Sequence, residues 1–251
     1  MATYDVADRS AIVTGAGKGI GRAVALILAA NGAAVVVADL DESAAAAVVA
    51  EIEQAGGVAT AFVGDVSKPE VNEALVAAAQ ELAPLRIAVN NAGIGGANAA
   101  TGDYPLDSWR KVIDINLDGV FYGVRAQIPA IAGNGGGSIV NMASVLGSVG
   151  IPGSVAYVTA KHGLLGLTKN AALEYGAQGV RVNAVGPGFI NTPLLEANLD
   201  EESKAQLAAQ HALGRLGTPE EVAALVAFLS SDAAGFISGS YHLVDGGYAA
   251  H

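Results

Sequence analysis

Short runs of β-branched and other apolar residues alternate along the chain with longer segments rich in alanine and leucine. The short runs have the length and composition of buried strands, and the longer segments are typical of helices. The predicted strands span residues 10–13, 34–38, 58–63, 87–89, 138–142, 180–185 and 241–244. Strand–helix alternation with continuously apolar strands predicts an α/β fold, a doubly wound seven-stranded parallel sheet with helices on both faces. Ligands of such sheets bind at the carboxyl ends of the strands.

Local capping signals indicate where several of the helices begin and end. We expect one helix to follow the first glycine-rich segment and run through Ala30, and another to cover residues 42–55. Ser67 is expected to cap a third helix, because Pro69 stands just inside it and Glu70 follows three residues after Ser67. This is the capping-box pattern.

A glycine-rich segment, residues 14–21, directly follows the first predicted strand and opens a helix. Gly15 permits a tight turn, and Gly19 lets a pyrophosphate approach the helix N-terminus, where free N–H groups and the helix dipole favour an anion. Gly21 lets the helix lie close to the sheet. The spacing is Gly-x-x-x-Gly-x-Gly, and no Gly-Lys-Ser/Thr follows, so the segment is not a P-loop. On its own it is also compatible with an ordinary strand-to-helix turn.

Asp39 closes the second predicted strand, about 20 residues beyond the glycines. A carboxylate there can accept hydrogen bonds from an adenosine ribose and would repel a 2′-phosphate. Taken alone, Asp39 could instead cap the next helix. Lys18 could attract a 2′-phosphate, but Leu40 adds no second cation. Because a carboxylate at the ribose should outweigh one solvated lysine, we expect NAD rather than NADP.

Four polar residues form a candidate catalytic set. Tyr157 and Lys161 are spaced i, i+4, which places both on one helix face. A nearby ammonium favours the phenolate and is expected to lower the pKa of Tyr157 toward a useful range for general acid/base work. Ser144 follows the fifth strand and could bond a substrate oxygen, and Asn116 lies in a helix interior, where asparagine is unfavourable without a task. Singly, these residues could be a helix surface pair and a loop serine.

Taken together and in order, these motifs make the chain resemble the short-chain dehydrogenase/reductase family over almost its whole length. The matching positions are 14–21, Asp65-Val66, Asn90-Asn91-Ala92-Gly93, the tetrad Asn116, Ser144, Tyr157 and Lys161, then Pro187-Gly188, Thr192 and Asp245-Gly246-Gly247. The resemblance implies one Rossmann-type catalytic domain over residues 1–251. The cofactor-binding residues assigned to it are Gly15, Lys18, Gly19, Ile20, Gly21, Asp39, Leu40, Asp65, Val66, Asn91, Ala92, Gly93, Tyr157, Lys161, Pro187, Gly188, Ile190 and Thr192.

The resemblance also implies a mechanism. Ser144 and Tyr157 bind the carbonyl oxygen, a nicotinamide supplies hydride to the carbonyl carbon, and Tyr157 donates the proton or acts as base in the reverse direction. Lys161 bonds the nicotinamide ribose and lowers the pKa of Tyr157. Asn116 holds a water that links Lys161 to solvent.

The substrate is expected to meet a segment that spans residues 189–210. Candidate wall residues are Ile94, Leu146, Phe189, Leu194 and Leu195, with Ser144 and Tyr157 at the reacting oxygen. No Arg or Lys stands among them, so a small neutral or hydrophobic ketone or alcohol fits better than a carboxylate or a phosphate ester. The alternative is that some of these residues are ordinary core. Residues 141–144, 186–190 and 240–248 look especially like those of bacterial NADH-dependent secondary-alcohol dehydrogenases and carbonyl reductases.

Composition narrows the choice of partners and chemistry. The net charge of −11 disfavours nucleic acid and an anionic membrane surface as partners. There is no Cys, which excludes disulfides, Cys-ligated zinc and thiol nucleophiles and fits a reducing cytoplasm. We expect neither a signal peptide nor a membrane span. The scattered histidines suggest no metal site, although an ion near the C-terminus stays open.

Three alternatives remain. A 3-oxoacyl-[acyl-carrier-protein] reductase would have the same fold and tetrad, but would be expected to use NADP and to carry basic residues for an acidic carrier. A sugar dehydrogenase of the same family is also open. A regulator that senses NAD without catalysis belongs to a different class, and the intact Ser-Tyr-Lys set argues against it. Small residues at Ala156, Ala160 and Gly163 form a stripe that continues to Leu167 and Ala171. Part of the stripe should pack on the sheet, and the family resemblance implies that another part forms a helix–helix dimer face within a homotetramer.

Overall fold

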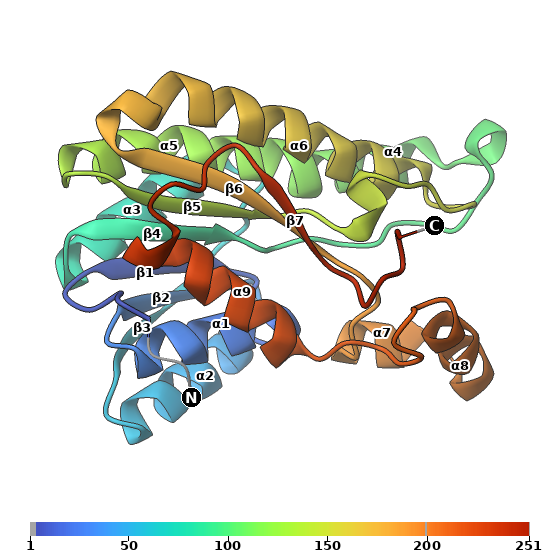
Figure 1. Ribbon diagram of the computed structural model, residues 1–251, viewed down its shortest axis with the longest axis horizontal. Helices are drawn as coiled ribbons and strands as arrows, with labels where there is room; N and C mark the ends of the chain where they lie inside the picture. The colour runs from blue at the N-terminus through green and yellow to red at the C-terminus, as the bar shows by residue number, and fades with distance from the viewer. Residues whose placement is uncertain (1–3, 199, 251) are drawn as a thin grey trace.

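One parallel sheet organises the protein (Figure 1). The structure is a computed structural model that describes residues 4–198 and 200–250. Within these residues the seven strands lie in the order β3-β2-β1-β4-β5-β6-β7, and every pairing between neighbours is parallel. The strands are β1 (Ser10–Thr14), β2 (Ala34–Asp39), β3 (Val58–Val63), β4 (Leu85–Asn90), β5 (Gly137–Met142), β6 (Val180–Pro187) and β7 (Tyr241–Val244). The predicted fold class is therefore confirmed.

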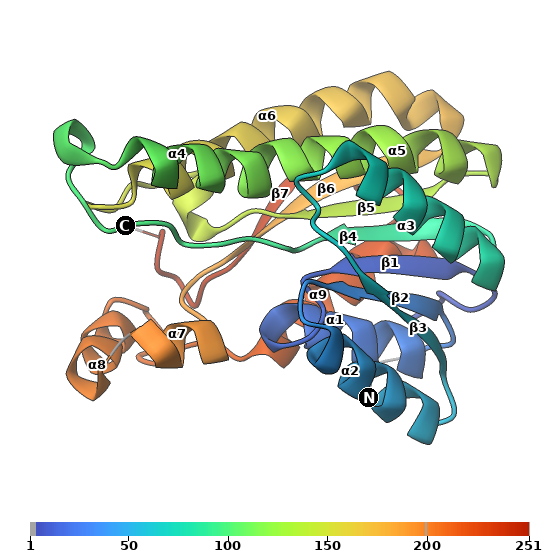
Figure 2. The same ribbon diagram turned by 180° about the vertical axis from the view of Figure 1, so that it is seen from behind.

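Helices cover both faces of the sheet (Figures 1 and 2). The helices are α1 (Gly19–Ala30), α2 (Glu42–Gln54), α3 (Pro69–Leu82), α4 (Leu106–Ile113), α5 (Gly119–Gly133), α6 (Val155–Tyr175), α7 (Pro193–Asn198), α8 (Glu201–Ala209) and α9 (Pro219–Ser230). A π-helical segment, η2 (Asp114–Asp118), joins α4 to α5, and short 3₁₀ turns are η1 (Thr101–Asp103), η3 (Val145–Gly147), η4 (Gly176–Gln178) and η5 (Asp232–Ala234). Helices α1, α2 and α9 pack on one face, and α3, α5 and α6 on the other.

Two hydrophobic cores follow from the alternation of side chains along each strand. Val13 of β1 faces the core under α1 and α9, whereas its neighbour Ile12 faces the core under α3, α5 and α6. Both side chains are fully buried. A parallel sheet with helices on both faces therefore needs apolar residues at successive positions, which is the pattern seen in the sequence.

The predicted capping box at Ser67 is wrong. Helix α3 begins at Pro69, and its N-cap residue is Lys68, which makes no side-chain capping hydrogen bond. The reason is local, because the Ser67 N–H already donates to Asp65 Oδ1 over 3.0 Å and the chain turns there before the helix starts. A capping box does occur at α9, where Thr218 and Glu221 exchange hydrogen bonds at the helix N-terminus.

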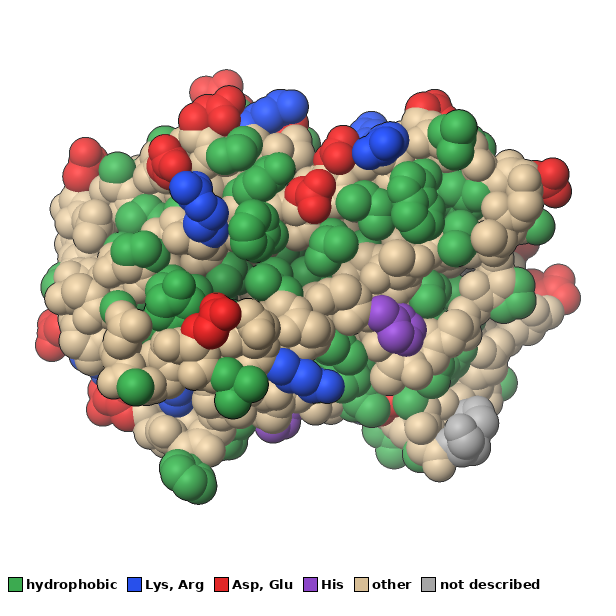
Figure 3. Space-filling model, turned by 90° about the horizontal axis from the view of Figure 1, so that it is seen from above, with side chains coloured by type: hydrophobic (Ala, Val, Ile, Leu, Met, Phe, Trp, Pro, Cys, Tyr) green, Lys and Arg blue, Asp and Glu red, His purple; other side chains and the backbone are tan. Residues whose placement is uncertain are grey.

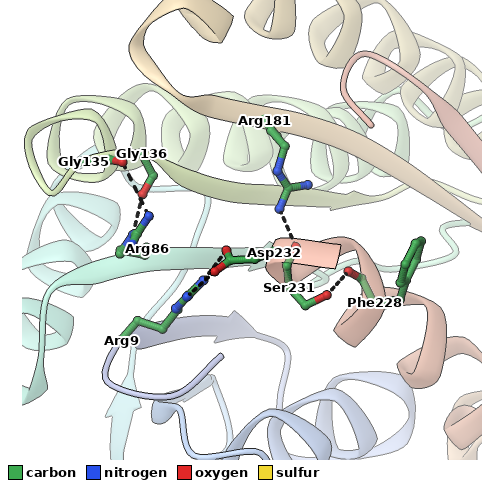
Figure 4. A network of polar contacts seen from close by, with 8 residues as sticks. All are labelled: Arg9, Arg86, Gly135, Gly136, Arg181, Phe228, Ser231 and Asp232. Atoms are coloured by element: carbon green, nitrogen blue, oxygen red, sulfur yellow. Dashed lines mark hydrogen bonds and ion pairs between the residues drawn. The ribbon is translucent and has the colours of Figure 1, made fainter. Parts of the chain in front are cut away.

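Three arginines close the edge of the sheet at which the strands begin (Figure 4). Arg9, nearly buried, donates to both carboxylate oxygens of Asp232 over 3.0 Å, which ties the start of β1 to η5. Arg181 donates to the carbonyls of Leu229 and Ser231, at the C-terminal end of α9, and Arg86 donates to the carbonyl of Gly136 after α5. Guanidinium groups thus connect the elements at the amino-terminal ends of the strands. The candidate site residues lie at the opposite, carboxyl-terminal ends.

The segment expected to meet the substrate contains two short helices, α7 and α8, and extends away from the sheet below the carboxyl ends of the strands (Figure 1). No helix within residues 4–198 and 200–250 is both long and apolar enough to cross a lipid bilayer.

Candidate active site

The glycine-rich turn has the backbone that an anion site needs. Gly15 and Gly19 have positive φ values of 61° and 56°, which side chains other than glycine rarely adopt. Helix α1 begins at Gly19, and its N-cap residue, Lys18, makes no side-chain capping hydrogen bond. No acidic residue stands in its first turn. The N–H groups and positive dipole end of a 12-residue helix therefore remain available to a phosphate group.

The neighbouring strand β4 holds this turn in place. Asn91 Nδ2 donates to the carbonyls of Thr14 and Gly15 over 2.9 and 3.1 Å. Thr14 Oγ1 accepts hydrogen bonds from the N–H groups of Asn91 and Ala92 over 3.0 and 3.1 Å. A Cβ atom on Gly21 would collide with the Gly15 carbonyl oxygen, which confirms the close packing predicted for this glycine. The turn lies where the strand order reverses between β1 and β4, the place at which such sheets bind ligands.

Asp39 ends β2 beside the glycine turn and is held by two backbone groups. Its Oδ2 accepts from the Gly17 N–H over 2.8 Å, and its Oδ1 accepts from the Asp41 N–H over 3.0 Å. It does not cap α2, because Asp41 performs that role through the Ala44 N–H. The fixed carboxylate keeps spare lone pairs, so ribose hydroxyls could still donate to it.

Lys18 and Leu40 flank this position and are both exposed. Lys18 is close enough to Asp41 to help lower the pKa of that carboxyl, whose main cause is the hydrogen bond from Ser43. Lys18, the cation that could attract a 2′-phosphate, thus lies near the Asp41 carboxylate.

The remaining segments expected to contact a cofactor gather around the same crevice. Thr192 approaches the glycine turn, because a Cβ atom on Gly19 would lie 3.4 Å from Thr192 Cγ2. Gly188 passes so close to β7 that its own Cβ would lie 2.8 Å from Asp245 Cα. Pro187 and Ile190 are buried beside it, Asp65 lies after β3, and the Val66 carbonyl accepts from Asn72 over 2.8 Å.

Lys161 is the buried cation of the site. It lies on α6 with only 3% of its surface exposed, and its Nζ donates to the Met142 carbonyl at the end of β5 over 2.7 Å. The same Nζ lies 5.5 Å from the centre of the Tyr157 ring, one helical turn away. The predicted pairing of these two side chains on one helix face is present in the structure.

The pKa values of the pair differ from the prediction for Tyr157. Burial raises the pKa of Tyr157, and the neighbouring Ser144 hydroxyl only partly opposes this effect. Burial also lowers the pKa of Lys161 to about 8. The expectation that Lys161 would lower the pKa of Tyr157 is therefore wrong for the described structure, because desolvation of the phenolate dominates.

Ser144 stands at the carboxyl end of β5, as predicted, and is nearly buried. Its Oγ accepts a hydrogen bond from the Leu146 N–H over 3.2 Å. The Ser144 carbonyl accepts from the Tyr241 hydroxyl over 2.5 Å. The serine is thus fixed from its side chain by η3 and from its backbone by β7.

Asn116 is fully buried within the π-helical segment η2. Its Oδ1 accepts from the Ile94 N–H over 2.9 Å, and its Nδ2 donates to the Ile94 carbonyl over 2.8 Å. A Cβ atom on Gly93 would lie 3.2 Å from Asn116 Oδ1 and 3.7 Å from Lys161 Nζ. The glycine therefore leaves space where Asn116 and Lys161 converge, and π-helical turns of this kind are frequent at functional sites.

The candidate wall residues of the substrate site lie in three different parts of the structure. Ile94, like Tyr157, packs against a small buried cluster around Val112 of α4, and Leu146 is buried in η3 next to Ser144. Phe189 and Leu195 are partly buried in the segment that leads into α7. The Leu194 side chain lies outside the part of the chain whose side chains the structure describes.

Two groups near the candidate site were not predicted from the sequence. The Met142 carbonyl gives no sequence signal, because any residue supplies one. His211 was missed as well, although its Nε2 accepts from the Phe189 N–H over 3.2 Å and its Nδ1 bonds the Leu207 carbonyl over 2.8 Å. Its ring packs against Phe189 and Tyr248. A histidine close after an apolar segment has no distinctive spacing, so only the fold brings these three rings together.

The site has the groups needed for a nicotinamide cofactor and for proton transfer. The anion-ready turn and the carboxylate at the end of β2 fit a dinucleotide, and the space at Gly93 beside Lys161 fits an approaching ribose. In the parts of the chain that the structure describes, no group of three or more His, Cys, Asp or Glu residues is arranged to hold a metal ion.

Comparison with known proteins identifies the class. A family model described as "Enoyl-(Acyl carrier protein) reductase" matches residues 15–249. The chain belongs to the short-chain dehydrogenase/reductase family, whose members are oxidoreductases that use a nicotinamide cofactor.

Individual relatives narrow the class further. The chain is 48% identical to a cyclohexanol dehydrogenase of Acinetobacter sp. (strain SE19), over 96% of this chain and 95% of the relative. It is 44% identical to a cis-4-hydroxycyclohexanecarboxylate dehydrogenase of Sinomonas cyclohexanicum, over 97% and 98% of the two chains. A crystal structure of a putative 2-deoxy-D-gluconate 3-dehydrogenase from Agrobacterium tumefaciens with bound NADP superposes with a TM-score of 0.89. That pair is 35% identical, and 98% of each chain is covered.

Proposed function

We propose that this protein is an NAD(H)-dependent dehydrogenase that interconverts a neutral cyclic secondary alcohol and its ketone. The observation that carries the proposal is the meeting of the buried Lys161, the Tyr157 ring and Ser144 at the carboxyl end of β5. This set stands beside a glycine turn that is suited to a dinucleotide. A proton donor, a hydroxyl for the substrate oxygen and a buried cation are what carbonyl reduction requires.

The chain's own residues would divide the work as follows. A bound nicotinamide supplies the hydride when a ketone is reduced and accepts it when an alcohol is oxidised. Ser144 Oγ and the Tyr157 hydroxyl hold the substrate oxygen, and Tyr157 gives that oxygen a proton during reduction. In the oxidation direction Tyr157 removes the hydroxyl proton.

Lys161 and Asn116 would support Tyr157. One Lys161 N–H is committed to the Met142 carbonyl, so two remain for ribose hydroxyls and for a proton path. Asn116 holds the Ile94 backbone through two hydrogen bonds and so keeps the chain around Gly93 open for the ribose.

The preference for NAD over NADP rests on charge at the end of β2. A 2′-phosphate would meet the Asp39 carboxylate, whose position is fixed by the Gly17 and Asp41 N–H groups. Lys18, a nearby cation, is exposed and lies close enough to Asp41 to interact with that carboxylate. The NADP in the structural relative belongs to that protein, so the nucleotide preference of this chain needs its own test.

The substrate class rests on the wall of the site and on the relatives. Ile94, Leu146, Phe189 and Leu195 are uncharged, so a neutral ring fits better than an acidic group. Two relatives above 40% identity are named for alcohols on a cyclohexane ring, one neutral and one with a carboxylate, so they support the ring alcohol, whereas its neutrality rests on the wall residues alone. An acyl-carrier-protein reductase is disfavoured by Asp39 and by the net charge of −11, which would repel an acidic carrier.

We place the enzyme in the cytoplasm as a homotetramer.

A substrate panel tests the proposal. Initial rates would be measured with cyclohexanol, cyclohexanone, acyclic secondary alcohols, a sugar lactol and an acetoacetyl thioester, each with NAD(H) and NADP(H). Highest kcat/KM for the cyclic pair with NAD(H) is the expected result. Turnover confined to the thioester with NADPH would replace the proposal by the acyl-reductase alternative.

A further inference from the structure

Four buried polar side chains form a continuous hydrogen-bonded chain beneath the tetrad. Asn90 Nδ2 donates to Gln127 Oε1 and to Asn141 Oδ1 over 3.1 and 3.0 Å, and Gln127 Nε2 donates back to Asn90 Oδ1 over 2.8 Å. Asn141 Nδ2 then donates to Thr168 Oγ1 over 3.0 Å. None of the four is more than 4% exposed. We call Gln127, Asn90, Asn141 and Thr168 the amide clasp.

Each member of the amide clasp comes from a different element, and each of these elements leads to part of the candidate site. The members come from α5, β4, β5 and α6. Along the chain the pairs are Gln127 with Asn116, Asn90 with Asn91, Asn141 with Ser144, and Thr168 with Lys161. Helix α5 continues directly from the π-helical segment that holds Asn116. The clasp therefore connects the four elements that carry the candidate site residues.

Helix α6 is the element that most needs such a connection. Its buried residues are largely small, with Ala160, Ala171 and Ala172 buried near Leu164 and Ala156 buried toward α4. Alanine side chains form only low ridges, so this stretch of packing gives little resistance to a shift along the helix axis. Within the described residues, two side-chain hydrogen bonds join α6 to the sheet, from Lys161 to Met142 and from Asn141 to Thr168.

Position along the helix links the two contacts. Thr168 is seven residues beyond Lys161, which is about two helical turns and the same face. A shift of α6 that lengthened the Asn141–Thr168 bond would move Lys161 and Tyr157 by the same distance relative to Ser144. The clasp contact is thus a reference point for the catalytic end of the helix.

The chemistry of the clasp also favours a positional role. Replacing two buried, hydrogen-bonded polar groups with apolar groups of similar shape is often nearly neutral for stability. A fully satisfied network instead specifies one arrangement, because its hydrogen bonds are lost when the parts shift. Gly123 of α5 makes room for it, since a Cβ atom there would lie 2.8 Å from Asn90 Oδ1 and 3.1 Å from Gln127 Nε2.

We propose that the amide clasp is a positioning device for catalysis, in which Asn141 and Thr168 fix where α6 lies along the sheet and so hold Lys161 and Tyr157 opposite Ser144. Its kinetic consequences rest on the proposed function, whereas its structural consequence can be measured without any substrate.

The test compares Thr168→Val with Thr168→Ser and with Ser138→Ala. Valine has the shape of threonine without the hydroxyl, and serine keeps the hydroxyl. Ser138 is the matched control, because it is a fully buried β5 residue whose hydroxyl donates to the Leu229 carbonyl over 2.8 Å, away from α6. For each variant kcat, KM, the pH profile and the melting temperature would be measured, together with amide hydrogen exchange over residues 155–165.

We expect Thr168→Val to lower kcat by ~10-fold, because displacements near 1 Å already cost that much or more. Its KM should stay within about twofold of the wild-type value, since ground-state binding is not what the clasp provides. The high-pH limb of its kcat–pH profile should shift, and the amide hydrogens of residues 155–165 should exchange faster than in the wild type. Thr168→Ser should restore the wild-type values, and Ser138→Ala should lower the melting temperature without changing kcat, pH profile or exchange.

The double variant Asn141→Leu/Thr168→Val removes both partners of the bond to α6, but it also leaves the Asn90 N–H that donates to Asn141 without that acceptor. It should therefore melt below the wild type and have a low kcat. If either variant does not fold in plain buffer, all variants would be compared in sucrose, which favours the folded state. Wild-type kcat and exchange in either variant would overturn the proposal, as would an equal loss of kcat in Ser138→Ala. If the wild type turns over no alcohol in the panel, the proposed function fails, while exchange over residues 155–165 still decides whether the clasp holds α6.

Discussion

At the scale of single residues, the chemistry depends on how burial distributes protons between Tyr157 and Lys161. Burial raises the pKa of Tyr157, so this hydroxyl keeps its proton through the neutral range. Burial lowers the pKa of Lys161 to about 8, so its ammonium form is lost in mildly alkaline solution. The pair is therefore arranged to give a proton to a ketone at neutral pH.

This distribution predicts opposite pH profiles for the two directions. Ketone reduction needs protonated Tyr157 and cationic Lys161, so its rate should fall as the pH rises through about 8. Alcohol oxidation needs the phenolate, whose fraction increases about tenfold per pH unit below its pKa, so oxidation should keep rising into the alkaline range. Steady-state rates in both directions between pH 6 and 10 would check this. Reduction that increases above pH 8 would contradict it.

Asp39 carries the prediction about the nucleotide. Asp39→Ser removes the charge that a 2′-phosphate would meet but keeps an oxygen that can accept from the Gly17 N–H. The ratio of kcat/KM for NADH to that for NADPH should fall by ~10-fold or more, in keeping with the loss of one close charge–charge interaction. Asp41→Asn serves as the control for charge that faces the α2 cap. An unchanged ratio in Asp39→Ser would show that the carboxylate does not select the nucleotide.

At the scale of elements, local patterns predicted the strands well and the caps less well. The sheet strands are predictable because each must be apolar at successive positions, as in β2. Ser67 misleads because the same three-residue spacing occurs without the cap geometry, once the Asp65 carboxylate has taken the Ser67 N–H. The amide clasp could not be predicted, because its members are far apart in the sequence and meet only when β4, β5, α5 and α6 are assembled.

The capping box of α9 provides a prediction for one element. Thr218 Oγ1 accepts from the Glu221 N–H over 3.3 Å, and Glu221 Oε2 accepts from the Thr218 N–H over 2.9 Å. Thr218→Ala should cost about 1 kcal/mol of unfolding free energy and lower the melting temperature by about 2–4 °C. Thr218→Ser should be close to the wild type. Calorimetry of the three proteins checks the difference, and an unchanged melting temperature in the alanine variant would refute it.

The same helix end contributes stability that is lost in acid. Hydrogen bonding to Arg215 lowers the pKa of Glu221 to about 2. Because the folded-state pKa is below the unfolded value of about 4.3, this contribution is complete above that value and is lost as the pH falls toward 2.

At the scale of the whole molecule, one outer face is suited to self-association. Figure 3 views the protein from the side of α4, α5 and α6, where hydrophobic side chains gather between charged ones. Phe121 of α5 and Leu173 of α6 are 47% and 85% exposed. A charge of −11 keeps the protein in solution, but it does not cover such residues.

We therefore expect a homotetramer in which the α5–α6 face forms one of the interfaces. Multi-angle light scattering should give four times the 24.9 kDa chain mass. The variant Phe121→Glu/Leu173→Glu should dissociate into smaller species, because each chain would bring two charges into the contact. Ala46→Glu/Ala50→Glu, at exposed positions of α2 on the other face of the sheet, provides a charge-matched control. A wild-type protein that runs only as a monomer would contradict the assembly.

The most direct test of the account is the kcat/KM for NADH-dependent reduction of cyclohexanone by the wild type and by Tyr157→Phe, with NADH affinity measured in parallel. The account predicts saturable turnover by the wild type. For Tyr157→Phe it predicts a loss of at least ~10³-fold, because one proton-transfer group typically contributes 10²–10⁴-fold, with NADH affinity nearly unchanged. Wild-type turnover in Tyr157→Phe would contradict the central claim that this hydroxyl carries the proton.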